Sequence, residues 1–162
     1  MSDIGDPRPL TAEAAGEIAE LLEEVAANDG QAVAGGWSAD SLAKQLNAGH
    51  SQAWGHRGAD GGALTSVILV QSVADRAEIL LIATAANARR QGLGVALINH
   101  LATDAASKGC EQIMLEAAAS NRAAIALYQR TGFTQTGLRP RYYGNEDAIL
   151  MTRKIGGIVD QN

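Results

Sequence analysis

The sequence predicts a single mixed α/β domain in which helices flank a mostly antiparallel sheet. At 162 residues the chain is long enough for one domain with its own core. Hydrophobic residues make up 46% of it and charged residues 19%, which is ordinary for a soluble globular protein. The patterns run from two helices through a meander of strands to helices that alternate with strands. No internal repeat or low-complexity linker divides the chain, so we expect one domain over residues 1–155 and a flexible tail over residues 156–162.

The N-terminal third contains two helical patterns. Residues 1–9 are expected to form a loose lead-in with a short strand near residues 8–10. Thr11 is placed to cap a first helix, which ends near residues 28–30. After a loop at residues 35–37, Ser38 is placed to cap a second, short helix through about Leu46. The apolar positions that predict the first helix recur every three or four residues: Ile18, Leu21, Leu22 and Val25.

The middle of the chain predicts an antiparallel meander. Residues 51–57 form a short, weak strand pattern, and the glycine-rich residues 58–62 indicate a hairpin turn. The stretch "ALTSVILVQ" at residues 63–71 is a stronger strand pattern. Asp75 and Arg76 mark another turn before the strand pattern "AEILLIAT" at residues 77–84.

The last third alternates between helix and strand. A helix is expected from about Leu93 to Ser107, ended by Gly109, and another over residues 120–131, ended by Gly132. Short strands are expected at residues 111–116, 133–138 and 147–154. Because Cys110 follows a helix-ending glycine and precedes a strand, we expect it to be a small buried hydrophobe.

Composition excludes several classes of function. The chain has 13 basic and 18 acidic residues, a net charge of −5, which argues against nonspecific binding of nucleic acid. One cysteine rules out an internal disulfide, and the three histidines lack metal-ligand spacing, so we expect no metal. No secretory signal and no apolar run of the ~20 residues that cross a bilayer is present, so we expect a cytoplasmic protein with no membrane partner. Nothing in the sequence decides between monomer and dimer.

The stretch "RRQGLG" at residues 89–94 predicts a phosphate-binding loop, because glycines at a helix start leave backbone N–H groups open to an anion. A nucleoside triphosphate loop needs four residues between its glycines and then Lys-Ser/Thr, which are missing. A dinucleotide loop needs a third glycine at position 97, which is Leu97. Coenzyme A stays open as a ligand, and so does a purely structural turn.

The pattern around and after this loop resembles the GNAT superfamily of acetyl-coenzyme A-dependent N-acetyltransferases. Within that superfamily, it is similar to the ribosomal-protein alanine N-acetyltransferases of the RimI type. The resemblance covers roughly residues 77–152 and also includes Trp37-Ser38. Its motifs are Arg89-x-x-Gly92-x-Gly94, "LEAAASNRAAIALYQRTGF" at residues 115–133, Arg141-Tyr142-Tyr143 and Glu146-Asp147-Ala148.

The resemblance implies a fold in which two splayed strands hold acetyl-CoA as the cosubstrate. In the family, one of these strands pairs through its backbone with the pantetheine arm, and the amides of the glycine loop bind the pyrophosphate. An asparagine at the next helix start contacts the cofactor as well, although Asn121 is also placed to cap that helix. The cofactor-binding residues implied are Ile82, Ala83, Thr84, Arg90, Gln91, Gly92, Leu93, Gly94, Val95 and Asn121.

The resemblance also implies two catalytic residues, Glu116 as general base and Tyr128 as general acid. A carboxylate can accept the proton of an attacking amine, and a tyrosine with a pKa near ~10 stays protonated and can donate to a leaving thiolate. The structural alternatives are that Glu116 only ends a strand and that Tyr128 only packs in the core. Glu78, on the strand before the loop, is a lesser candidate for the base.

The acceptor implied is the N-terminal α-amine of a protein, with a ribosomal protein as the expected partner. Tyr142 and Tyr143 match tyrosines that help seat the substrate peptide in N-terminal acetyltransferases. An α-amine with a pKa near ~8 costs roughly 3.3 kcal/mol less to deprotonate than a lysine near ~10.4. Two alternatives stay open: transfer to a lysine, polyamine or other small-molecule amine, and an acyl-CoA-binding module without catalysis.

Two departures from the family pattern bear on specificity. The closest relatives usually carry a valine and an arginine where this chain has Ala117 and Ala118. The loop formed by Gly144 and Asn145 is also shorter than the usual one. We expect both changes to affect the choice of acceptor more than the acetyl transfer itself.

Overall fold

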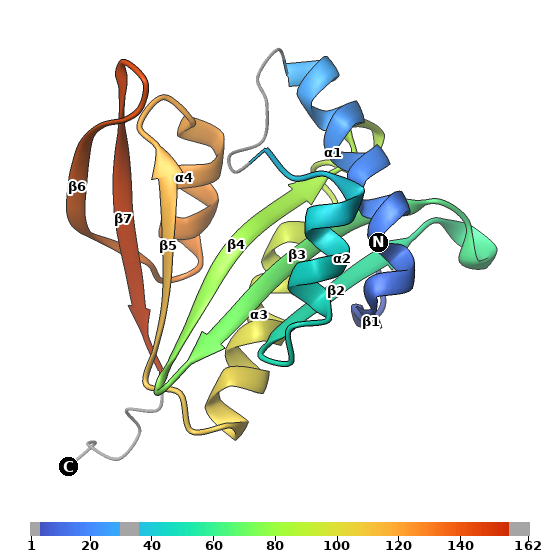
Figure 1. The fold of residues 1–162 in the computed structure, drawn as a ribbon, viewed down its shortest axis with the longest axis horizontal. Helices are drawn as coiled ribbons and strands as arrows, with labels where there is room; N and C mark the ends of the chain where they lie inside the picture. Colours follow the sequence, from blue (N-terminus) through green and yellow to red (C-terminus); the bar gives the residue numbers. More distant parts are fainter. Residues whose placement is uncertain (1–3, 30–35, 156–162) are drawn as a thin grey trace.

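The computed structural model describes residues 4–29 and 36–155, which form a sheet of seven strands with helices on both of its faces (Figure 1). The strand order is β1-β2-β3-β4-β5-β7-β6. Neighbouring strands are antiparallel except for β4 and β5, which are parallel. The predicted fold class, mixed and mostly antiparallel, is therefore confirmed. The tail expected at residues 156–162 lies outside the described residues.

The elements follow the predicted order closely. The helices are α1 (Ala15–Asp29), α2 (Ala39–Leu46), α3 (Leu93–Ser107) and α4 (Arg122–Arg130), with 3-10 turns at Ala12–Ala14, Ala59–Gly61 and Ala86–Ala88. The strands are β1 (Arg8–Leu10), β2 (Ser51–Arg57), β3 (Leu64–Val73), β4 (Arg76–Thr84), β5 (Gln112–Ala118), β6 (Thr134–Tyr143) and β7 (Glu146–Lys154). In the part of the chain described, no helix is both long and apolar enough to cross a membrane.

Both predicted N-terminal caps are present. The Thr11 hydroxyl accepts a hydrogen bond from the Glu13 amide at 3.3 Å, at the start of the turn that leads into α1. At α2, the Ser38 hydroxyl accepts from the Ser41 amide at 3.1 Å, and the Ser41 hydroxyl accepts from the Ser38 amide at 2.8 Å. Such reciprocal capping satisfies two of the N–H groups that a helix start leaves unpaired.

The sheet separates two apolar cores, because successive side chains of a strand point to opposite faces. Along β3, Val67 and Leu69 pack with α1 and α2, whereas Ile68 and Val70 pack with α3 and α4. Cys110 is buried in the α3/α4 core, as predicted. The main contributors to the α1/α2 core are Ile18, Leu22, Leu42 and Leu81, and those to the α3/α4 core are Leu97, Ile98, Leu101, Ile113 and Met151.

A β-bulge interrupts β4 at Leu80. Its neighbours Ile79 and Leu81 pair with Val70 and Leu69, which are consecutive in β3, so Leu80 is the extra residue. Ile79 packs in the α3/α4 core, whereas Leu80 and Leu81 both pack against the α1/α2 core. The bulge therefore shifts the alternation of side chains along β4 by one residue: Ala77 and Ile79 face the α3/α4 core, whereas Leu81 and Ala83 face the α1/α2 core.

The expected end of the sixth strand at residue 138 is wrong, because β6 continues to Tyr143. The added stretch contains Pro140, which lacks the N–H that a central strand needs. β6 is the edge strand of the sheet, where proline is tolerated, and its pairing with β7 is irregular between Arg139 and Tyr143. Tyr142 and Tyr143 are thus strand residues rather than part of the connection.

Smaller differences concern element ends. β3 extends to Val73 and β4 already starts at Arg76, so the turn between them is tighter than expected. β5 runs from Gln112 through Ala118, and α4 starts at Arg122 because Asn121 caps it instead of belonging to it.

Candidate active site

The site forms where β4 and β5 separate. Their parallel pairing comprises the register pairs from Arg76↔Gln112 to Ile79↔Leu115. Beyond that point β4 continues to Thr84 along β3, and β5 continues to Ala118 along β7. Figure 1 shows the two strands side by side at their starts and far apart at their ends. Among the described residues, no strand pairs with residues 80–84 on their β5 side, and an extended ligand could pair with Ile82, Ala83 and Thr84 there.

The connection from β4 to α3 has the geometry of an anion-binding loop. Arg90 and Gly92 both adopt left-handed backbone conformations, with φ of 63° and 83°. The first helical hydrogen bond runs from the Ala96 amide to the Gly92 carbonyl at 3.0 Å, so the amides of residues 93–95 precede any such bond. No acidic side chain occupies the first turn of α3. Open amides and the helix dipole together favour a phosphate at this end.

The two glycines of the loop have different structural roles. Gly92 needs its freedom for the left-handed backbone, and a Cβ there would meet no atom within 4 Å. Gly94 has an ordinary helical backbone, but a Cβ there would lie 3.1 Å from Leu127 Cδ2 of α4. Gly92 therefore shapes the loop, and Gly94 lets α3 approach α4 closely.

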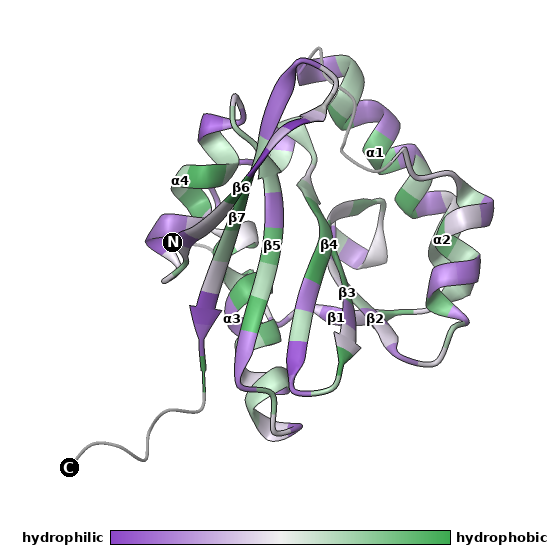
Figure 2. Cartoon of the chain, turned by 60° about the vertical axis from the view of Figure 1, so that its left-hand side comes forward, coloured by the Kyte–Doolittle hydropathy of each residue, from purple (hydrophilic) through white to green (hydrophobic). Residues whose placement is uncertain are grey.

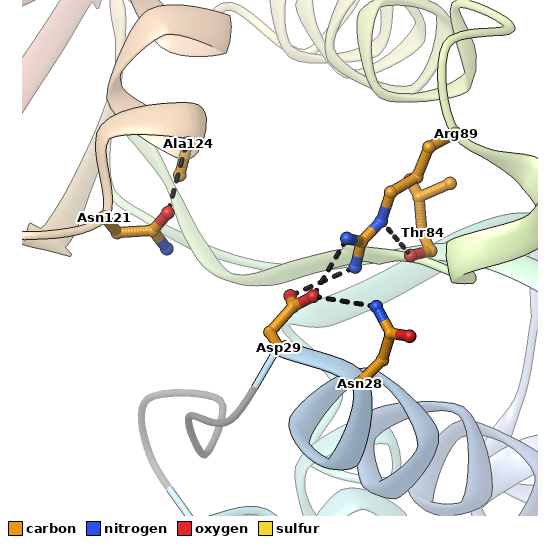
Figure 3. Close-up of polar contacts among 6 residues, drawn as sticks. All are labelled: Asn28, Asp29, Thr84, Arg89, Asn121 and Ala124. Atoms are coloured by element: carbon orange, nitrogen blue, oxygen red, sulfur yellow. Dashed lines mark hydrogen bonds and ion pairs between the residues drawn. The ribbon is translucent and has the colours of Figure 1, made fainter.

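Arg89 anchors the start of this loop (Figure 3). Its guanidinium donates to both carboxylate oxygens of Asp29, at 2.9 and 3.1 Å, and its Nε donates to the Thr84 carbonyl at 3.2 Å. The hydrogen bond from Arg89 lowers the pKa of Asp29, and the same contact raises the pKa of Arg89. Asn121 lies on the other side of the view, where its side-chain oxygen accepts from the Ala124 amide at 3.2 Å and caps α4.

A groove of about 220 Å³ lies over the same strands on the face opposite α3 and α4. Figure 2 looks onto β4 and β5 from this side, with α1 and α2 standing to the right of them. The charged side chains that line the groove are the carboxylates of Glu78 and Glu116 and the guanidinium groups of Arg76 and Arg139. Met114 and Leu150 add apolar surface. The two carboxylates and the two guanidinium groups balance, so the lining of the groove carries no net charge.

Glu116 faces this groove because of the alternation along β5. Its neighbours Leu115 and Ala117 are buried in the α3/α4 core, so Glu116 points to the other face. Arg139 Nε lies 3.4 Å from Glu116 Oε2, an ion pair. That oxygen is buried and accepts no hydrogen bond from the described residues. A carboxylate oxygen in this state is available to accept a proton from a ligand.

Tyr128 lies on the opposite side of the sheet from Glu116. It is only 6% exposed, and it packs in the α3/α4 core with its ring edge-to-face against Phe133, 5.8 Å between centroids. The two predicted catalytic residues therefore lie on opposite faces of the sheet, Glu116 in the groove and Tyr128 in the α3/α4 core. The packing role considered for Tyr128 is real, and its role as a general acid stays a prediction.

The remaining predicted residues lie around the groove. Glu78 lines it on β4, where its carboxylate accepts a long hydrogen bond from the side-chain amide of Gln71, at 3.5 Å. Tyr142 is 51% exposed, and the Arg139 guanidinium carbon lies 5.3 Å from the centre of its ring. The side chain of Tyr143 lies outside what the structure describes.

Sequence reasoning missed Arg139, Arg76 and Asp29. Arg139 and Arg76 enter the site only because β6 and the start of β4 lie beside β7 and β5 in the sheet. The one available signal for Asp29 was an acidic residue at a helix C-terminus, where it is unfavourable. Among the described residues, no group of three or more His, Cys, Asp and Glu side chains could hold a metal ion.

The chain is similar to known proteins in sequence and in fold. The family model described as "Acetyltransferase (GNAT) family" matches residues 17–133. The [ribosomal protein bS18]-alanine N-acetyltransferase of Escherichia coli K12 is 41% identical over 98 residues, 58% of this chain and 66% of that protein. The chain thus spans less than two thirds of that relative in the sequence alignment.

Solved structures extend the likeness to nearly the whole fold. The crystal structure of the Escherichia coli ribosomal-protein-S18-alanine N-acetyltransferase has a TM-score of 0.80 and 26% identity, covering 96% of this chain and 97% of that one. A putative streptothricin acetyltransferase from Bacillus anthracis, solved in complex with acetyl coenzyme A, has a TM-score of 0.63 and 22% identity. That match covers 70% of this chain and 67% of the other and is a likeness of fold alone.

The different roles of the loop glycines predict different costs of substitution. Gly92→Ala is expected to lower the free energy of unfolding by about 1–2 kcal/mol, the cost of a left-handed alanine. Gly94→Ala is expected to change it by less than about 1 kcal/mol, because helix propensity improves while the flexible Leu127 side chain yields. Urea denaturation of both variants measures the two values. A larger loss for Gly94→Ala would contradict the assignment.

Proposed function

The chain belongs to the acetyltransferase (GNAT) family, and on that premise we propose that it transfers an acetyl group from acetyl-CoA to the N-terminal α-amine of a protein. The observation that carries the proposal is the separation of β4 from β5 beyond Ile79↔Leu115, with an anion loop at one end and Glu116 beside the gap. The likeness to the bS18-alanine N-acetyltransferase favours a ribosomal protein as the acceptor.

The residues present fit acetyl-CoA. The open edge of β4 at Ile82, Ala83 and Thr84 offers backbone groups to the amide-rich pantetheine arm. The amides of residues 90–95 lie at the start of α3, which carries no acidic side chain in its first turn and so accepts a pyrophosphate. Asn121, at the start of α4, is proposed as a further contact. When bound, acetyl-CoA supplies the acetyl group as an activated thioester.

The opposite placement of Glu116 and Tyr128 fits a direct attack through the gap. The neutral amine approaches from the groove, and its lone pair forms the new C–N bond with the thioester carbon while Glu116 takes the proton that the nitrogen loses. The C–S bond breaks toward the other face, where Tyr128 donates its proton to the departing thiolate. Burial of Tyr128 in the α3/α4 core keeps water away from that proton transfer.

The groove favours a peptide over the alternative acceptors. A polyamine or a lysine-directed site is expected to carry excess negative charge, but Arg76 and Arg139 balance Glu78 and Glu116 here. The extra roughly 3.3 kcal/mol needed to deprotonate a lysine also works against it. A pure acyl-CoA-binding module has no use for a carboxylate beside the gap whose buried oxygen accepts no hydrogen bond from the described residues, as at Glu116. We therefore propose the N-terminal α-amine, with the exposed Tyr142 and with Tyr143 seating the peptide.

A panel of peptides tests the acceptor. Peptides beginning with Ala, Ser, Thr or Met are compared with an N-terminally blocked peptide that has one internal lysine, and release of coenzyme A is followed for each. We expect turnover with free N-termini, highest for alanine, and little with the blocked peptide. Turnover of the lysine peptide alone would show that the enzyme is a lysine acetyltransferase.

A matched pair of variants tests the general base. Glu116→Gln removes the carboxylate beside the gap, and Glu78→Gln removes the other carboxylate of the groove. We expect Glu116→Gln to lower kcat by about 10²–10⁴-fold, the usual contribution of a general base, and Glu78→Gln to leave kcat nearly unchanged. The reverse order of effects would move the base to Glu78.

Tyr128→Phe tests the general acid. The variant keeps the ring that packs against Phe133, so the core and the binding of acetyl-CoA should be preserved. Loss of the hydroxyl is expected to lower kcat by about 10²-fold or more. Steady-state rates and the thermal midpoint are measured together. Unchanged kcat at an unchanged midpoint would leave Tyr128 with only its packing role.

A further inference from the structure

We propose that Asp29 is a positioning residue for the acetyl donor. Through Arg89 it holds the start of the phosphate loop, residues 89–95, in the conformation that accepts the donor, and it thereby links the end of α1 to the donor side of the site. This inference rests on the proposed function and adds to it a residue that lies outside the loop and the splayed strands.

The contact joins three separate segments (Figure 3). Asp29 is the last residue of α1, Thr84 is the last residue of β4, and Arg89 begins the loop. Both carboxylate oxygens of Asp29 accept from the Arg89 guanidinium at 2.9 and 3.1 Å, while Arg89 Nε donates to the Thr84 carbonyl at 3.2 Å. The side-chain amide of Asn28 donates to Asp29 Oδ1 at 3.2 Å and restrains the carboxylate further. A planar guanidinium fixed at three points defines where the loop departs from β4.

The location of Asp29 within its helix is otherwise unfavourable. The C-terminal end of a helix carries a partial negative charge, which repels an acidic side chain. The last turn of α1 contains no basic residue that would offset this repulsion. Arg89 is the cation that does so, from a position 60 residues away in the sequence. The carboxylate therefore serves the loop rather than the helix.

The loop needs such an anchor because its backbone is strained next to Arg89. Arg90 adopts a left-handed conformation with φ of 63° although it carries a side chain, and Gly92 is left-handed two residues later. A left-handed non-glycine residue persists only where its surroundings hold it. With its guanidinium engaged by Asp29 and Thr84, Arg89 fixes the residue immediately before this strain. The anchor thus preserves the arrangement of amides that receives the pyrophosphate.

The molecule contains a matched control for this contact. Arg57 of β2 donates to both carboxylate oxygens of Glu17 in α1, at 2.6 and 2.8 Å. That ion pair also ties α1 to the sheet and is similarly exposed, but it lies away from the phosphate loop. Glu17→Gln therefore reports the effect of weaker docking of α1 alone.

Asp29→Asn, Asp29→Ala and Glu17→Gln are compared with the wild type by calorimetric titration with coenzyme A and by steady-state kinetics. We expect both Asp29 variants to raise the Kd of coenzyme A and the KM of acetyl-CoA by about fivefold, the upper effect of one exposed ion pair. Their kcat should stay within about twofold of wild type, because Glu116 and Tyr128 are untouched. Glu17→Gln should leave Kd, KM and kcat unchanged.

Three results would overturn the inference. An unchanged Kd in the Asp29 variants would show that the contact does not shape the loop. Tighter binding would show that Asp29 restrains an arginine that itself binds phosphate. Equal weakening in Glu17→Gln would reduce the effect to docking of α1. If the wild-type protein failed to bind coenzyme A at all, the proposed function would fall first and this inference with it.

Discussion

The short parallel pairing of β4 with β5 determines the rest of the structure. β5 is hydrogen-bonded to β7 along its whole length, and β4 follows β3 to its end, but the two strands share only the pairs up to Ile79↔Leu115. The described sheet is therefore two antiparallel halves joined at a parallel hinge. The bulge at Leu80 follows the last shared pair directly, and beyond it Leu81 and Ala83 pack in the α1/α2 core while Ile82 packs against the α3/α4 core. The edge of β4 beyond Ile79 is therefore open, although β4 stays paired with β3 and β5 stays paired with β7.

The separation of β4 from β5 also explains how the two proposed catalytic groups, which lie on opposite faces of the sheet, can serve one reaction. In a continuous sheet, Glu116 and Tyr128 would be separated by backbone and side chains. Where β4 and β5 diverge, a ligand that lies between them contacts both faces at once. In the proposed reaction, Glu116 then meets the acceptor on the side of the groove, and Tyr128 meets the leaving group on the side of α4. The alternation of side chains along β5 places Glu116 on the groove face, and so determines the face from which the proposed acceptor approaches.

Most of the fold was predictable because its signals are local. Apolar spacing and capping residues place α2 and α3 within a residue or two, and they place α1 except for its start, where Ala12–Ala14 form a 3-10 turn. The resemblance implied the splayed strands. The sequence could not separate the roles of Gly92 and Gly94, since one depends on a backbone angle and the other on Leu127 in a different helix. Asp29 and Arg139 were missed for the same reason. Their partners, Arg89 and Glu116, lie far away along the chain and become neighbours only in the folded structure.

Of the two alanines that depart from the family pattern, Ala118 acquires a physical meaning in the sheet, whereas Ala117 is buried in the α3/α4 core on the other face. Ala118 pairs with Ala148 of β7, and Ala148 pairs with Arg139 of β6, so the three residues form one row across the strands on the face of Glu116. Two methyl side chains in this row leave space for the long side chain of Arg139 to reach Glu116 from the edge strand. Arg139 also lies over the ring of Tyr142. The cation beside the proposed base is thus tied to the proposed peptide-binding aromatic, and an arginine at position 118 would compete for the same space.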